Sequence, residues 1–223
     1  HIAVPNPLRS ANQGILQLIS GVGVAVFNDD AEKFDLCLKA FRTDAAGGLL
    51  SSLPNGQLGD TGRDFHSYGQ LQHLTWIAEV FWKQGVDVFA EHDNRLLAAG
   101  EYFARYNLGF DTPFVQAGTV YDVYPDINTL GDVGQAYGGS PDALNIIHGA
   151  YVVRKGMSAP FLEAFQAVLS EDSESFDRRK AADASTALPP DPLPPAPAVA
   201  SVTSLNNAEM GDASPAGNAA YAN

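Results

Sequence analysis

The chain of 223 residues is divided into helix-length segments by glycine and proline, and this pattern constrains its fold more than any other feature. Apolar residues recur at helical spacing within the segments, and glycines stand close behind the segments that end near Lys83, Leu108 and Lys155. Glycine is a common helix stop because it adopts a left-handed backbone without steric cost. The sequence therefore predicts an all-α domain.

The predicted helices form successive hairpins. A first helix from about Ser10 to Phe27 has a strand at 21–27 as its alternative, because that stretch is rich in valine and phenylalanine. A second helix follows the Asn-Asp-Asp turn at 28–30, where an aspartate serves as N-cap. The later helices are predicted at about 66–83, 93–109 with Asp93 as N-cap, 140–155 and 158–169. Residues 44–62 and 110–139 are predicted as loops.

Helical hairpins in series favour part of an (α/α) toroid, or a solenoid, over a four-helix bundle. We expect this domain to cover residues 1–169. From residue 170 onward the composition changes to Asp, Glu, Ser, Pro and Ala, which cannot bury enough apolar surface to form a core. Residues 170–223 are therefore predicted to be a disordered acidic tail.

Composition excludes several classes of function. The net charge of −13, with only 13 Lys and Arg, argues against nucleic-acid binding, and no apolar run is long enough to span a membrane. A single cysteine, Cys37, excludes an internal disulfide, and no paired-Cys or His-Glu spacing suggests a metal site. An N-terminal His1 is compatible with a copper site, but the disulfides and strands typical of such oxygenases are missing. No metal or organic cofactor is predicted.

The third predicted helix carries a polar stripe. His66, Gln70 and His73 follow the i, i+4, i+7 spacing of one helix face. For the two histidines the alternative is that they have no functional role, since histidines on a polar face are usually solvated or hydrogen-bonded. Similarly, Arg63 and Asp64 could form a loop ion pair, and Tyr68 could be a packing aromatic. Trp76 and Trp82 are predicted to lie in the core, which leaves Tyr121, Tyr124 and Tyr137 as better candidates for stacking against a sugar.

Residues 59–109 carry an ordered set of motifs: Gly-Arg-Asp followed by His66, a helix that ends in Gln-Gly-Val-Asp, Asn-Arg-Leu-Leu, and Glu-Tyr before Tyr-Asn-Leu-Gly. This segment resembles the alginate-lyase domain family of polysaccharide lyases, and weaker similarity extends over about residues 10–165. The family has one more residue between the Arg-Asp pair and the histidine, and its domain is longer at the N-terminus. We therefore expect this domain to be incomplete at its N-terminus.

The resemblance implies cleavage of a uronic-acid polymer by β-elimination, in which a base removes the C5 proton beside a neutralised carboxylate. It implies catalytic roles for Tyr68, His66 and Arg63. Tyr68 is the expected acid, Tyr68 and His66 are the alternative bases, and Arg63 donates hydrogen bonds to the substrate carboxylate. Four further residues are predicted to bind substrate: Asn12, Gln13, Gln70 and His73. The family has an Asn-His pair that either corresponds to Asn12 and Gln13 in this chain or is missing from it.

The resemblance further implies an extracellular or periplasmic protein, a monomer, whose partner is an anionic polysaccharide. Its substrate would be similar to alginate or glucuronan. Two alternatives stay open from sequence. One is a carbohydrate-binding or truncated remnant of such a domain without catalytic activity, and the other is a helical interaction module that binds no sugar.

Overall fold

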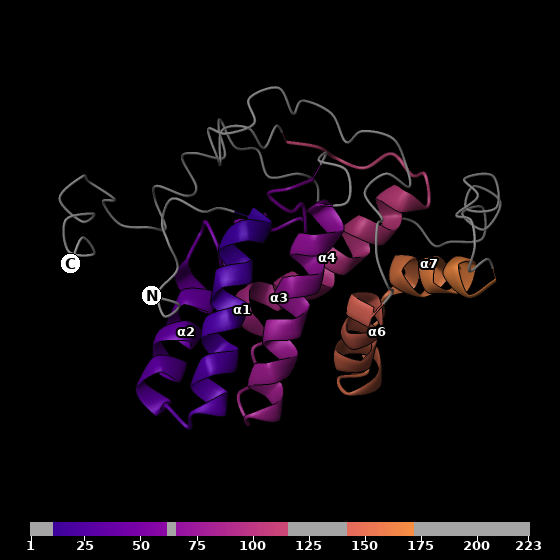
Figure 1. Ribbon diagram of the computed structural model, residues 1–223. Helices are drawn as coiled ribbons and strands as arrows, with labels where there is room; N and C mark the ends of the chain where they lie inside the picture. Colours follow the sequence, from indigo (N-terminus) through magenta and orange to yellow (C-terminus); the bar gives the residue numbers. More distant parts are fainter. Residues whose placement is uncertain (1–10, 62–65, 116–141, 172–223) are drawn as a thin grey trace.

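The computed structural model describes residues 11–61, 66–115 and 142–171, and this part of the chain is helical (Figure 1). Apart from an isolated bridge between Ser52 and Leu58, no strand occurs within these ranges. The all-α prediction is thereby confirmed for the described residues. None of the described helices combines the length and apolar composition needed to cross a lipid bilayer.

Helices α1 (Ala11–Phe27) and α2 (Ala31–Thr43) form the first predicted hairpin. Ile15, Leu18 and Val22 of α1 share one buried helical face, so the strand alternative for residues 21–27 is wrong. Asp30 is the N-cap of α2, as predicted: its Oδ1 accepts a hydrogen bond from the backbone N–H of Lys33 at 3.0 Å.

Helices α3 (His66–Lys83) and α4 (Glu91–Asn107) form the second hairpin, and Gly85 follows α3 with a φ of 86°. The predicted N-cap Asp93 is wrong, because α4 begins at Glu91. His92, Asp93 and Asn94 instead have positive φ values between 49° and 61°. The start of α4 is tied to the end of α2, where Arg42 Nε donates to Glu91 at 2.8 Å and the His92 ring bonds the Arg42 carbonyl.

Helix α6 (Asp142–His148) continues into the π-helical turn η2 (Gly149–Val153), and α7 (Pro160–Glu171) follows. The predicted start at Ser140–Pro141 lies outside the described residues, but Gly156, with a φ of 65°, and Pro160 stand where the sequence places a stop and a start. Helix α7 extends two residues beyond the predicted domain boundary at 169. The rest of the predicted tail lies outside the described residues.

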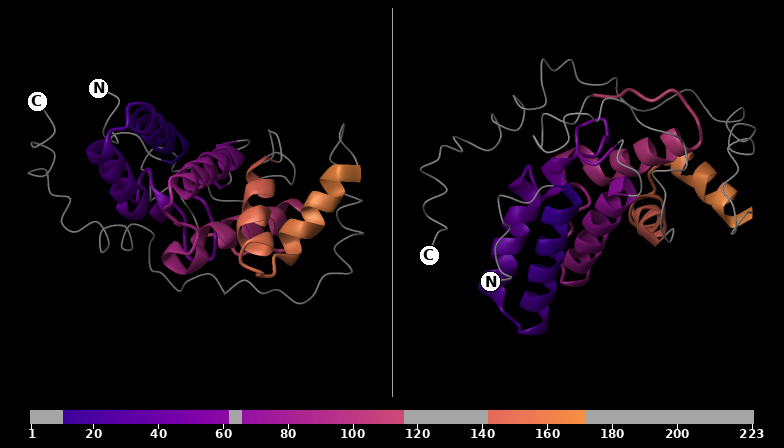
Figure 2. Two further views of the ribbon diagram at one scale, coloured as in Figure 1. Left: turned by 90° about the horizontal axis from the view of Figure 1, so that it is seen from below. Right: turned by 45° about the horizontal axis from the view of Figure 1, so that its top comes forward.

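The helices are arranged side by side in the order α2, α1, α3, α6 and α7, with α4 behind α3 (Figures 1 and 2). Helix α3 packs against α1 on one side, α6 on the other and α4 at its back. Helix α4 in turn packs against α6 and α7. Among the described elements, α3 is therefore the most enclosed, and one of its faces is not covered by another described helix.

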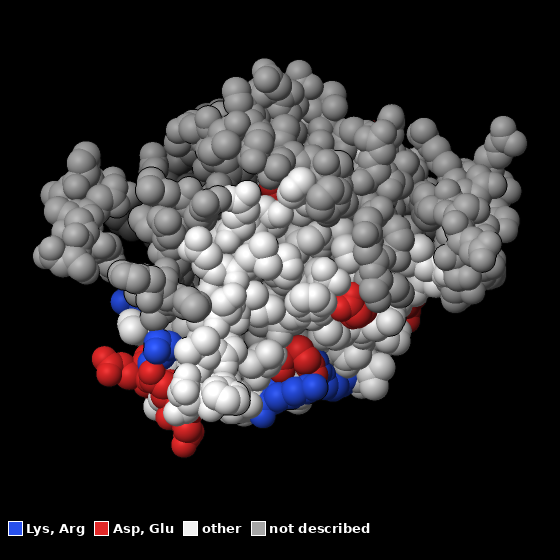
Figure 3. All heavy atoms as spheres, in the orientation of Figure 1, with Lys and Arg blue, Asp and Glu red and all other residues white. Residues whose placement is uncertain are grey.

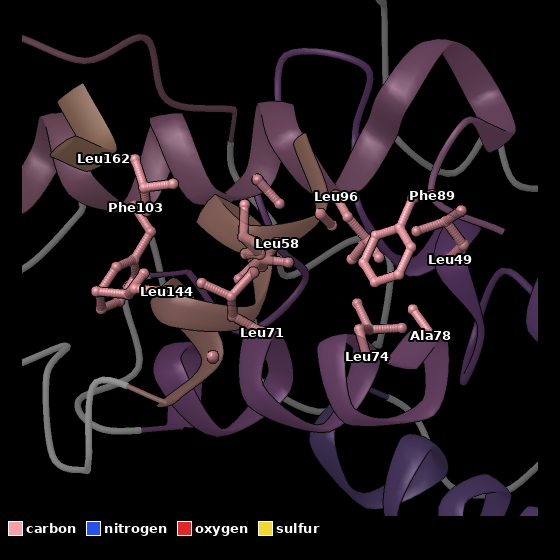
Figure 4. Packing of buried hydrophobic residues seen from close by; sticks show 14 of the residues in the cluster. Leu49, Leu58, Leu71, Leu74, Ala78, Phe89, Leu96, Phe103, Leu144 and Leu162 are labelled. Carbon is pink, nitrogen blue, oxygen red and sulfur yellow. The ribbon is translucent and has the colours of Figure 1, made fainter. Parts of the chain in front are cut away.

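The core lies between α3 and α4 and extends to α6 and α7. Figure 4 shows Leu71 and Leu74 of α3 directed toward Leu96 and Phe89, and Leu144 and Leu162 beside Phe103. The predicted loop at 44–62, which contains the short 3-10 turn η1 (Leu49–Ser51), packs against this core rather than lying on the surface. Gly56, with a φ of 91°, sits so close to α4 that a Cβ would lie 2.0 Å from the Ala98 carbonyl oxygen.

Candidate functional site

The uncovered face of α3 is the candidate site. Between its first residue and Trp76, all side chains that point toward α1, α4 or α6 are buried, and the partly exposed residues fall on one line at helical spacing. We call these residues the α3 strip: His66, Gly69, Gln72, His73 and Trp76. The face of the molecule that Figure 3 presents is mostly uncharged where described atoms are visible.

A carboxylate from α6 fixes one edge of the strip. Asp142 Oδ2 accepts the indole N–H of Trp76 at 2.7 Å, and its Oδ1 accepts from the Gln72 amide at 2.9 Å. The Tyr68 hydroxyl donates to the same Oδ1 at 3.2 Å. These three donors stand at i, i+4 and i+8 along α3, so one carboxylate aligns a whole edge of the helix.

Tyr68, the predicted acid, lies beneath the strip rather than on it. Its side chain is only 2% exposed, and its ring packs against Phe103 with the centroids 5.5 Å apart. The alternative considered from sequence, that Tyr68 is a packing aromatic, therefore accounts for the position of its side chain. As the structure stands, the hydroxyl is directed to Asp142 and the ring is enclosed, so a catalytic role for Tyr68 requires local opening.

The two predicted histidines of α3 both belong to the strip. His66 is its first residue and is partly exposed. His73 is two turns further on, and its ring meets that of Trp76 edge-on, with the centroids 5.6 Å apart. Burial lowers the pKa of His73, which favours the neutral imidazole. Its buried Nδ1 has no hydrogen-bond partner among the described residues.

Gln70 is turned into the protein, unlike the two histidines. Its side chain is fully buried, its Oε1 accepts the backbone N–H of Asp60 at 2.8 Å, and its amide nitrogen donates to Ser51 Oγ at 2.9 Å. These bonds fasten the 49–61 loop to α3. A structural role explains Gln70 fully, and its side chain does not reach the strip.

Asn12 and Gln13 are at the start of α1, beside the same loop. The backbone N–H of Asn12 donates to Asp60 Oδ2 at 2.8 Å, so Asp60 caps α1 from a distant part of the chain. The Asn12 side-chain oxygen is buried without a hydrogen-bond partner among the described residues, whereas Gln13 is exposed. The structure thus brings the start of α1 and the loop before α3 together, as the predicted site requires.

Several predicted residues lie outside the described ranges. Arg63 is within 62–65, and the proposed stacking aromatics Tyr121, Tyr124 and Tyr137 are within 116–141. The core prediction is wrong for Trp82, which is 39% exposed beneath the Arg154 guanidinium, 4.4 Å from its ring centroid. Within residues 11–61, 66–115 and 142–171, no group of three or more His, Cys, Asp or Glu side chains is placed to hold a metal ion.

Sequence reasoning missed Asp142 and Gln72, and it predicted Trp76 for the core, whereas the structure leaves that side chain partly exposed. The spacing of Tyr68, Gln72 and Trp76 was a usable signal, because hydrogen-bond donors at i, i+4 and i+8 line one edge of a helix. Their shared acceptor could not be foreseen, since it is 66 to 74 residues further along the chain. No protein-family model, curated protein or solved structure matches the chain.

Proposed function

We propose that this chain is part of an (α/α) toroid polysaccharide lyase that cleaves a uronic-acid polymer by β-elimination. One observation carries the proposal. Helix α3, which lies within the segment that resembles the alginate-lyase family, presents His66, His73 and Trp76 together on the face that no other described helix covers. Imidazole and indole groups in one row suit a sugar polymer that needs both a base and an apolar contact.

His66 is the proposed base. It is partly exposed at the start of α3, three residues after Arg63, whose guanidinium is proposed to neutralise the substrate carboxylate. That neutralisation lowers the barrier for removal of the C5 proton, since the developing charge spreads onto the carboxylate. Tyr68 is proposed as the acid that protonates the leaving O4. In this role its hydroxyl must break its hydrogen bond to Asp142 and donate to the substrate oxygen instead.

The helix arrangement supports the toroid. Three successive hairpins place α1, α3 and α6 next to one another, while α4 packs against both α3 and α7. Helical hairpins that follow one another around a common axis pack against each other in this way. The location proposed with this function, outside the cell or in the periplasm, follows from the polymeric substrate.

The test is the ultraviolet absorbance of the unsaturated uronate product, with alginate, polymannuronate, polyguluronate and glucuronan offered in turn. We expect product from at least one polymer, and a loss of about 100-fold or more in His66→Gln, because general-base catalysis contributes at least that much. Tyr68→Phe should show a comparable loss if Tyr68 is the acid. His92→Gln, an exposed histidine on α4, is the matched control and should keep full activity.

A second candidate is a carbohydrate-binding domain without catalysis. It is favoured by the absence of lysine and arginine from the α3 strip and by the enclosed ring of Tyr68. In that case the polymers bind, as measured by calorimetry, and no unsaturated product forms with any of them.

A further inference from the structure

Trp76 is the aromatic side chain of the α3 strip, and the core does not account for it. It is partly exposed, and it is not among the partly buried hydrophobic side chains that pack against the described core. A large indole at the surface leaves apolar area exposed to water. A ligand that covers this area gains the free energy of burying it.

The orientation of the Trp76 ring is fixed from two sides. Its N–H is bonded to Asp142, which is itself held by Gln72 and Tyr68, and His73 meets the ring edge-on at an interplanar angle of 66°. A ring held in this way loses little conformational entropy when a ligand stacks on it. The arrangement is therefore suited to binding a flat apolar face.

The strip beside the ring is open at Gly69, two turns before Trp76, as far as the described residues are concerned. A Cβ built at this position meets none of their atoms within 4 Å. A chain molecule that extends from Trp76 toward His66 along α3 therefore passes over backbone rather than over a side chain.

We propose that Trp76, oriented by Asp142, is a stacking platform for one pyranose ring of the polymer; this inference rests on the proposed function, which supplies the polymer. The C–H face of the sugar covers the indole. The uronate carboxylate points away from Asp142, because two carboxylates on the same side repel each other.

The chain's two tryptophans permit a matched test. With excitation at wavelengths that tyrosine does not absorb, Trp76 alone emits in Trp82→Phe, and Trp82 alone emits in Trp76→Phe. We expect short alginate and glucuronan oligomers to change the fluorescence of Trp82→Phe saturably and to leave that of Trp76→Phe unchanged. By calorimetry, Trp76→Phe should bind about tenfold more weakly than the wild type, a loss of about 1.4 kcal/mol.

Gly69→Leu provides a second variant that leaves the Trp76 bonds intact. Its side chain fills the open space on the strip, and we expect it to weaken oligomer binding about tenfold or more without lowering the temperature of thermal unfolding, since leucine favours a helix more than glycine does. The platform is overturned if the oligomers bind equally to Trp76→Phe and the wild type, or if none of them binds to the wild type. A fluorescence response without unsaturated product would retain the platform and reject the lyase.

Discussion

Glu101 is a buried carboxyl whose protonation depends strongly on folding. It is 4% exposed, and its two oxygens accept the backbone N–H groups of Phe161 and Leu162 at the start of α7, at 3.3 Å and 2.8 Å. Burial raises its pKa from 4.5 to about 7, against the effect of these hydrogen bonds, and the nearby Glu163 adds to the increase.

Because the pKa of Glu101 is higher in the folded chain than in the unfolded chain, the folded state binds the proton more tightly. The free energy of unfolding therefore falls as the pH rises from about 4.5 to about 7, by up to about 3 kcal/mol from this group. Glu101→Gln should reduce that slope in urea unfolding measured across this range. Glu32→Gln, an exposed control on α2, should keep it, and equal slopes in Glu101→Gln and the wild type would refute the assignment.

Glycine at position 69 is expected to cost stability. The site is helical and open, so Gly69→Ala should raise the free energy of unfolding by about 0.5 to 1 kcal/mol through a smaller entropy loss on folding. Gly100, in α4, is the matched contrast, since its Cβ would lie 3.2 Å from two Ile147 carbons. The midpoint temperature of thermal unfolding should be higher for Gly69→Ala than for the wild type, and lower for Gly100→Ala than for Gly69→Ala. The reverse order would mean that the strip has no room for a side chain at position 69.

At the level of elements, Gln70 joins α3 to the buried 49–61 loop. Gln70→Ala removes the acceptor for the Asp60 N–H inside the protein, and we expect a loss of about 2 to 3 kcal/mol in the free energy of unfolding. Gln72→Ala is the control on the same helix, because Gln72 is partly exposed and Asp142 keeps two other donors. Losses of equal size in the two variants would contradict the structural role given to Gln70.

The elements divide into those that local sequence determines and those that it does not. Periodic apolar residues and their stops predicted α1, α2, α3 and α7, since these signals act within a few residues. The start of α4 was misplaced because Arg42, nearly fifty residues earlier, contacts Glu91 and His92 there. The candidate site shows the same division: helical spacing predicted that His66 and His73 share one face of α3, whereas Asp142 comes from another helix.

At the scale of the whole molecule, a net charge of −13 opposes the approach of a polyanionic substrate. Salt screens that repulsion, since the Debye length falls from about 30 Å at about 0.01 M to about 8 Å at about 0.15 M ionic strength. We therefore expect the KM for the polymer to decrease over this range. An increase in KM would instead indicate that local cations at the site dominate binding.

If the chain breaks uronic-acid polymers by elimination, as we propose, mass spectrometry of the reaction products will show it. Elimination adds no water, so each new non-reducing end should be an unsaturated uronate, one water lighter than a saturated end, and His66→Gln should leave the polymer intact. Saturated ends would show hydrolysis, and an uncleaved polymer with the wild type would contradict the lyase assignment.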